Sequence, residues 1–293
     1  MPKFLFGSAV APHQDYLVVS ARVAEMEARG ADHDVLLFRV GGKWSALPLA
    51  EPIAALNWDG ASVQALTIDG LNYVVSASGV VKEVLDASAD GPGRTQAIMG
   101  GAVIEGKAYA CGMTRQVYRR DVHGWARADA GARLNDVVGF KAIAGVSESE
   151  LYAVGFGGEI WSFDGAVWTQ EDSPTSVKLE CTVIGPDGDV YAAGGRGVVV
   201  HGRKGRWEVL ENQASEDTIW DATVSSGRTC FSSDRGVRVV SENGAVEKLT
   251  TPFDGKITFG NLASSEGQLW SVGRLDIALF EDGAWSLLSP PDI

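Results

Sequence analysis

The segment Leu151-Tyr152-Ala153-Val154-Gly155 is the clearest copy of a short apolar pattern that returns along the chain. Each copy contains one residue, here called the anchor, inside a strand-like run that ends at glycine or serine. The anchor is aromatic in most copies. The anchors are Tyr73, Tyr109, Tyr152, Tyr191, Cys230 and Trp270. They recur about every 40 residues, and so regular a spacing indicates an architecture built from repeated units.

A late tryptophan accompanies the anchor. It comes at nearly the same offset beyond the anchor in four copies, at Trp125, Trp168, Trp207 and Trp285. Val246 takes this position after Cys230. Trp44 lies farther beyond its own anchor, Tyr16, than the other tryptophans do, which adds a first unit with an insertion. The chain therefore contains seven units.

Each unit is predicted to form four short strands. In the unit of Tyr152 these are residues 142–146, 151–154, 159–163 and 167–170, which are rich in Val, Ile, Tyr and Trp and separated by Gly, Asp and Ser. Asp164-Gly165 is a favourable hairpin dipeptide because glycine adopts a positive φ without a Cβ clash. A helical pattern is found only at residues 21–29, inside the insertion of the first unit.

Four antiparallel strands repeated about every 40 residues are typical of a β-propeller. One such sheet cannot bury both faces, but seven packed radially can, and the closed ring leaves only short edges. We predict an all-β single domain, a seven-bladed β-propeller with blades at about 3–50, 51–94, 95–134, 135–174, 175–213, 214–252 and 253–293 and an insertion at 21–34. The late tryptophans should lie on the outer strands and pack between blades.

These repeats resemble the broad class of seven-bladed propellers that includes WD-repeat and Asp-box proteins. The stretch Ser162-Phe163-Asp164-Gly165-Ala166-Val167-Trp168 is similar to an Asp-box turn, although one residue shorter between Asp and Trp. Trp-Asp pairs occur at Trp58-Asp59 and Trp220-Asp221, but neither ends a third strand as a WD repeat requires. The resemblance covers the whole chain and implies a fold rather than a function.

Composition excludes several classes of protein. Of 293 residues, 45% are hydrophobic and 22% charged, so the chain can bury a large core and is not intrinsically disordered. Lys and Arg number 25 against 38 Asp and Glu, and the net charge of -13 argues against nucleic-acid and anionic-membrane partners. Three cysteines, Cys111, Cys181 and Cys230, are too few and odd in number for a disulfide framework, so we expect buried thiols and a cytoplasmic protein.

The predicted partner-binding face carries the loops between second and third strands and those between blades, here called the upper face. Candidate binding residues on it are Arg115, Arg196, Arg235, Arg274, Trp220 and Phe156. Arginines in such an array bind carboxylates, phosphates or an acidic loop of a partner. In the alternative interpretation each arginine pairs within the protein with an acidic inter-blade loop, which offers Glu171, Asp172, Glu211, Glu216, Asp217 and Asp254. Trp220 is either an exposed anchor for a partner or a core plug.

The inner strands should line a central channel. Counting nine residues back from the anchors gives four polar candidates to face it, Gln64, Thr182, Asp221 and Asn261. They either bind a small ligand or metal, with Asp221 and Asn261 foremost, or contact channel water.

Sequence tests for catalysis give no assignment. The four histidines and three cysteines lack the spacing of zinc motifs, and neither a Gly-x-Ser-x-Gly elbow nor a phosphate-binding loop is present. We expect no catalytic residues, no cofactor and no metal, while paired carboxylates for glycoside hydrolysis stay open because their spacing is three-dimensional.

We therefore interpret the chain as a non-catalytic, protein-binding propeller of the cytoplasm, monomeric when alone. One concrete form is a bacterial immunity or antitoxin protein that caps a basic partner protein, which the acidic charge would attract. Two alternatives remain: a hydrolase or lyase acting on a sugar or anionic small molecule at the channel mouth, and a general scaffold for complex assembly.

Overall fold

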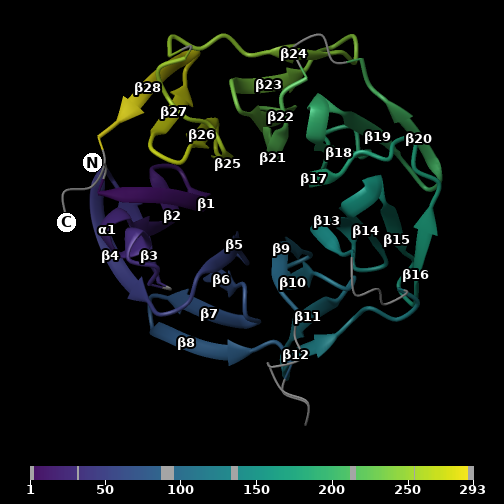
Figure 1. Cartoon of the computed structure of the whole chain (residues 1–293), viewed down its shortest axis with the longest axis horizontal. Coiled ribbons are helices and arrows are strands. Elements are labelled where there is room, and N and C mark those ends of the chain that lie inside the picture. The colour runs from purple at the N-terminus through teal and green to yellow at the C-terminus, as the bar shows by residue number, and fades with distance from the viewer. Residues whose placement is uncertain are drawn as a thin grey trace.

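The computed structural model describes residues 3–31, 33–86, 96–132, 138–211, 216–253 and 255–289. It contains seven four-stranded antiparallel sheets arranged as blades around a central axis (Figure 1), which confirms the predicted fold class. In every blade the strands follow chain order from the centre of the ring to its rim. The chain thus completes one blade before it begins the next.

The strands are grouped here by their position in the blade. The innermost strands are β1 (Phe4–His13), β5 (Ile53–Trp58), β9 (Ile98–Ile104), β13 (Phe140–Ser147), β17 (Leu179–Ile184), β21 (Ile219–Ser225) and β25 (Asn261–Ser265). The second strands are β2 (Tyr16–Val23), β6 (Val63–Thr67), β10 (Lys107–Gly112), β14 (Glu150–Gly155), β18 (Val190–Gly194), β22 (Arg228–Ser233) and β26 (Gln268–Val272). The third strands are β3 (Asp34–Val40), β7 (Leu71–Ser76), β11 (Val117–Asp121), β15 (Ile160–Phe163), β19 (Val199–Arg203), β23 (Gly236–Val240) and β27 (Ile277–Glu281). The outermost strands are β4 (Lys43–Leu49), β8 (Gly79–Val84), β12 (Gly124–Arg127), β16 (Trp168–Glu171), β20 (Arg206–Val209), β24 (Val246–Lys248) and β28 (Ala284–Leu288).

Packing between blades forms the core, and the late tryptophans take part in it as predicted. Trp168 on β16 is 2% exposed, contacts the rings of Phe140 and Phe163, and donates from Nε1 to the Ala128 carbonyl at 2.7 Å. Trp207 on β20 meets Tyr152 of the preceding blade edge-on. An outer-strand indole therefore closes the gap between its own blade and the one before it.

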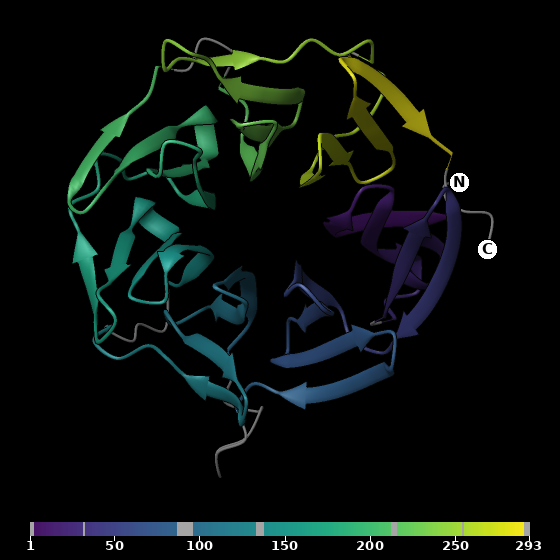
Figure 2. The same cartoon turned by 180° about the vertical axis from the view of Figure 1, so that it is seen from behind.

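Ring closure joins the first blade to the last without exchanging a strand, since β1 and β25 belong to different sheets. Figure 2 shows the two blades side by side, purple next to yellow. The Phe6 N–H donates to the Arg274 carbonyl at 2.9 Å, and Asn261 Nδ2 donates to the Gly7 carbonyl at 2.9 Å. A buried cluster that includes Trp270 and Leu17 fills the boundary. The closure therefore depends on packing and hydrogen bonds between intact sheets.

The second blade departs from the predicted register. Tyr73 lies on the third strand β7, opposite Ala65 of the second strand β6, whereas the other six anchors lie on second strands. The cause is that β6, the segment Val63–Thr67, is buried along its whole length and carries no aromatic residue, so the pattern matched the next strand instead. Every position counted back from Tyr73 is consequently displaced by one strand.

The insertion in the first blade forms a short helix, α1 (Ala24–Ala28), between β2 and β3. The predicted loop at residues 21–34 is thus shorter, because residues 21–23 extend β2 and Asp34 begins β3. His33 fixes the loop: its Nε2 accepts the Val23 N–H at 2.9 Å and its Nδ1 donates to the Ala31 carbonyl at 2.8 Å.

The three cysteines are free and buried, as expected from their strand-like surroundings. Burial raises the pKa of the Cys111 thiol to about 12 and that of Cys230 to about 11. Such thiols are not nucleophilic at neutral pH. Within the described ranges no helix combines the length and apolar character that crossing a bilayer requires.

Candidate partner-binding surface

The central channel is a cavity of about 760 Å³ lined by the inner strands. Three of the four predicted channel residues line it: Thr182 on β17, Asp221 on β21 and Asn261 on β25. Gln64 does not, because the displaced register of the second blade puts it on β6, where it is fully buried. The correct inner strand of that blade is β5.

Two of the three channel residues connect neighbouring blades, and the third bonds within its own blade. Asp221 Oδ2 accepts the Leu262 N–H of the next blade at 2.8 Å, and Oδ1 accepts the Ala222 N–H at 2.8 Å. Asn261 reaches the first blade, as described above, and Thr182 Oγ1 donates to the Tyr191 carbonyl at 3.0 Å. Burial raises the pKa of Asp221 to about 6, against the opposing effect of the two backbone hydrogen bonds.

Sequence reasoning missed the charged pair in the channel. Lys141 and Glu180 line the cavity, with Lys141 Nζ 3.6 Å from Glu180 Oε2. Glu180 precedes the predicted channel residue Thr182 by two residues, and Lys141 holds the same position relative to its own anchor, Tyr152. Because side chains alternate along a strand, extending the count by two residues would have found them.

The upper edge of the sixth blade brings five side chains together: Asp217, Trp220, Asp234, Arg235 and Arg238, here named the blade 6 cluster. Trp220 is 46% exposed, and its Nε1 donates to Asp234 Oδ1 at 2.7 Å. Arg235 and Arg238 contact different oxygens of the Asp217 carboxylate, each at 3.5 Å. Arg238 is buried, whereas the Arg235 side chain is 80% exposed. Trp220 is thus an exposed aromatic residue rather than a core plug.

Arg196 lies next to this cluster, because its turn, η3 (Gly195–Gly197), packs against β21. Its backbone is left-handed, with φ +54°. The same turn in the fourth blade, η2 (Phe156–Gly158), places Gly157 at that position with φ +67°. The fifth blade therefore projects an exposed arginine from a position where glycine is the easier residue.

Arg115 has a different environment from the other predicted arginines. Its side chain is 11% exposed, and Nε and a terminal nitrogen lie 2.8 and 2.7 Å from Glu159 Oε2 in the next blade. The guanidinium also stacks over the Trp161 ring, 5.1 Å from its centroid. This buried ion pair joins two blades, so Arg115 does not belong to the exposed set.

The remaining candidates lie apart from the blade 6 cluster. Arg274 is exposed on the seventh blade, next to the exposed Leu275, near the closure of the ring. Phe156 is half-buried beneath Lys178, whose Nζ lies 4.6 Å from the ring centroid. Of the acidic loop residues considered as internal partners, Asp217 takes that role for Arg235, and Asp254 lies outside the described residues. Of the predicted binding residues, Arg196, Trp220 and Arg235 therefore share one surface.

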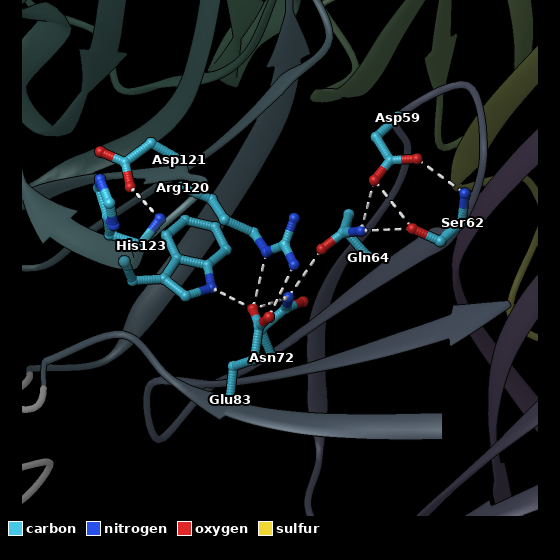
Figure 3. Close-up of polar contacts among 9 residues, drawn as sticks. Asp59, Ser62, Gln64, Asn72, Glu83, Arg120, Asp121 and His123 are labelled. Atoms are coloured by element: carbon cyan, nitrogen blue, oxygen red, sulfur yellow. Dashed lines mark hydrogen bonds and ion pairs between the residues drawn. The ribbon is translucent and has the colours of Figure 1, made fainter. Parts of the chain in front are cut away.

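The opposite, lower face contains a polar network that sequence reasoning missed (Figure 3). Gln64 Nε2 donates to Asp59 Oδ2 at 2.7 Å, and Gln64 Oε1 accepts from Asn72 Nδ2 at 2.7 Å. Glu83 receives two hydrogen bonds from Arg120, at 2.7 and 2.8 Å. These hydrogen bonds hold the pKa of Glu83 below its ordinary value although burial opposes them. The network ties the second blade to the third and accounts for the buried position of Gln64.

One group of side chains among the described residues has the spacing of metal ligands. It consists of Asp187, Asp189 and His201 on the lower face of the fifth blade. No sequence motif predicts this group, because strand β18 and the turn after it separate His201 from Asp189, the nearer of the two aspartates.

The solved structures most informative for this chain share its fold at low sequence identity. The WD40 β-propeller domain of Doa1 aligns with a TM-score of 0.74 and 11% identity over 96% of this chain and 94% of that one. YCF48 bound to D1 peptide aligns with a TM-score of 0.69 and 13% identity over 95% and 91% of the two chains. These likenesses confirm the predicted resemblance to the propeller class.

A curated relative is much closer in sequence. The immune protein Tsi7 of Pseudomonas aeruginosa is 33% identical over 262 residues, which span 88% of this chain and 82% of Tsi7. No protein-family model matches the chain. The relative confirms, at the level of the family, the interpretation of the sequence as an immunity-type, protein-binding propeller. The chain belongs to the family of the immune protein Tsi7.

Proposed function

We propose that this protein is an immunity protein that binds a protein toxin and blocks it, using the upper face of the fifth and sixth blades. The observation that carries the proposal is the 33% identity to an immune protein along 88% of the chain. The propeller supplies a rigid frame, since every blade is a complete sheet and the ring is closed by hydrogen bonds.

The surface of Arg196, Trp220 and Arg235 has the composition of a binding hot spot. Tryptophan and arginine are the residues that most often dominate the affinity of protein interfaces. The hydrogen bond to Asp234 holds the Trp220 indole in place, so little side-chain entropy is lost when a partner covers it. Arg196 and Arg235 offer guanidinium groups to carboxylates or carbonyls of the partner.

The electrostatic field of the chain favours a basic partner. A net charge of -13 attracts a cationic protein over long range and accelerates association more than it tightens the complex. We propose in addition that the protein acts in the cytoplasm as a monomer, and that neither nucleic acid nor membrane competes for its acidic surface.

The test begins with capture of the partner by the tagged full chain from the host that encodes it. The captured protein is then produced from an inducible promoter, where it should arrest growth, and co-production of this chain should restore growth. A captured protein without toxicity, or one that the chain does not neutralise, contradicts the proposed function.

The surface is tested separately with purified proteins. Trp220→Ala should weaken the complex by about 2 kcal/mol, roughly 30-fold in Kd, and Arg196→Glu should weaken it further. Arg228→Glu is the matched control, because Arg228 is an exposed arginine at the lower end of the same sixth blade. Loss of affinity with Arg228→Glu alone would move the contact to the lower face.

A further inference from the structure

The lower end of the fifth blade holds two aspartates and a histidine in a fixed arrangement. Asp187 and Asp189 lie in the turn between β17 and β18, and His201 lies on β19 directly opposite Tyr191. The Tyr191 hydroxyl donates to Asp187 Oδ2 at 2.7 Å, and the Asp189 N–H donates to Asp187 Oδ1 at 3.1 Å. The Asp187 carboxylate is therefore held by the turn and by the neighbouring strand before any ligand arrives.

Glycine is required where this turn begins. A Cβ on Gly185 would lie 2.4 Å from the Tyr191 ring and 2.7 Å from Asp187 Oδ1. Only a residue without a side chain lets the tyrosine and the carboxylate take these positions, so the local sequence is built around the acid.

The distances within the group match those between ligands of one metal ion. His201 Nε2 lies 3.2 Å from Asp189 Oδ2 and 3.5 Å from Asp187 Oδ2, and one ligand atom from each residue falls within 4.8 Å of the others. Ligands bound about 2.0–2.2 Å from an ion are separated by roughly 3–3.5 Å. His201 Nε2 is also buried and, among the described residues, has no hydrogen-bond partner. With the ring proton on Nδ1, the lone pair of Nε2 is directed into the group.

We propose that Asp187, Asp189 and His201 bind one divalent transition-metal ion, with Zn²⁺ as the preferred ion. An imidazole nitrogen with two carboxylate oxygens suits zinc and its neighbours in the first row, whereas calcium and magnesium favour oxygen ligands alone. Three protein ligands leave a coordination position for water or for a group of a partner. The ion would fasten the turn between β17 and β18 to β19 and stabilise the lower end of the blade.

The surroundings are compatible with a cation. A hollow of about 700 Å³ next to the group gives access from solvent. Arg203, Lys204 and Arg206 also line it; Arg203 and Lys204 both pair with Glu150, at 2.5 and 3.2 Å, so this carboxylate offsets one of their two charges. Glu208 Oε1 lies 3.6 Å from His201 Nδ1, beyond hydrogen-bond length, and its negative charge favours a proton on Nδ1 once Nε2 binds an ion.

The test is a calorimetric titration of the metal-free full chain with Zn²⁺. We expect one equivalent to bind and the 15N resonance of His201 Nε2 to shift. His201→Ala and Asp189→Asn should each weaken binding by more than about tenfold, the loss that removing even a supporting residue commonly causes. Asp189, 40% exposed, is the safer variant for folding if His201→Ala fails to fold.

His123→Ala is the matched control, because His123 lies in the corresponding hairpin of the third blade next to Asp121. This variant should bind Zn²⁺ as the unchanged protein does. The proposal is wrong if the unchanged chain binds no stoichiometric Zn²⁺, or if His123→Ala weakens binding as much as His201→Ala. The test does not depend on the toxin, so it can fail while the proposed immunity function stands.

Discussion

Two boundaries between blades, the one between the third and fourth and the one between the fifth and sixth, use the same backbone plan with opposite chemistry. The first is filled by Trp168, Trp161 and Phe140, and its upper edge is sealed by the buried pair of Arg115 and Glu159. The second has Val246 in place of the outer tryptophan, and its upper edge leaves aromatic and cationic side chains in solvent.

The difference separates residues that hold the ring from residues that are available to a partner. An arginine that is stacked on an indole and paired with a buried carboxylate has no capacity left for another protein. Trp220 and Arg235, in contrast, contact the carboxylates of Asp234 and Asp217 and remain 46% and 80% exposed. Substitutions at the two boundaries should therefore act on different quantities, stability at the first and affinity at the second.

The largest effect on stability is expected from Trp168→Ala. Removing this buried indole leaves a cavity at the first boundary and should lower the free energy of unfolding by about 3–5 kcal/mol. Chemical denaturation monitored by circular dichroism measures the loss. Trp220→Ala, the comparison variant, should change stability by less than about 0.5 kcal/mol. Equal losses for both tryptophans would contradict the division between the two boundaries.

The next effect comes from a matched pair of arginine variants. Arg115→Met leaves Glu159 buried without its cation and should cost about 3 kcal/mol of unfolding free energy. Arg235→Met removes an arginine that is mostly in solvent and should cost no more than about 0.5 kcal/mol. The same denaturation experiment reports both numbers. A neutral Arg115→Met would mean that the buried pair does not hold the blades together.

The channel side of the sixth blade should make stability depend on pH. The pKa of Asp221 is about 6 in the folded protein against 3.8 ordinarily, so the folded state retains a proton that the unfolded state releases between these values. Unfolding free energy should therefore fall as pH rises from about 4 to 6 and then level off. Because channel water screens the charge, the fall due to Asp221 should be about 1–2 kcal/mol.

Asp221→Asn should remove that part of the pH dependence, as seen in denaturation curves recorded between pH 4 and 8. Asp34, whose pKa burial also raises to about 6, should continue to contribute its own part. An unchanged pH profile in Asp221→Asn would show that water solvates this carboxylate as it does an exposed one.

The architecture could be predicted from the sequence because the repeated residues mark which strands are buried and which lie at the rim. Anchors such as Tyr152 and Tyr191 mark buried second strands, and the late tryptophans mark the outer strands that pack against the preceding blade. The predicted strand assignment was wrong in the second blade, where the second strand lacks the aromatic anchor. There the second strand carries only small and aliphatic side chains with Gln64, and the aromatic anchor moved to β7.

The positions of the candidate residues, though not their binding role, can be compared with the structure, and they were predicted in part. The count of nine residues back from the anchors placed Thr182, Asp221 and Asn261 in the channel, and loop order placed Arg196, Trp220 and Arg235 on one face. Sequence order could not show that Arg115 would meet Glu159, 44 residues away in the next blade, or that His201 would meet Asp187 and Asp189. Those contacts arise from the packing of separate strands and are not encoded by any local pattern.

The smallest expected change in unfolding free energy is at Arg196, where the fifth blade can be compared with the fourth at a single residue. The left-handed backbone at φ +54° costs an ordinary residue about 1–2 kcal/mol, whereas Gly157 takes the same turn in the fourth blade without that strain. Arg196→Gly should relieve the strain, and the greater freedom of glycine in the unfolded chain offsets about 0.5–1 kcal/mol of the gain. We expect a net rise of about 0.5–1 kcal/mol in the free energy of unfolding and a weaker complex with the partner.

Arg196→Ala separates the two causes, because alanine removes the guanidinium and keeps the strained backbone. It should lose the same affinity as Arg196→Gly and gain none of its stability. If glycine proves no more stable than alanine, the turn is not strained in solution. If a strained backbone is kept so that its side chain can act in binding, removing the side chain must weaken binding. If alanine binds the partner as tightly as arginine does, the strain at this position therefore does not serve recognition.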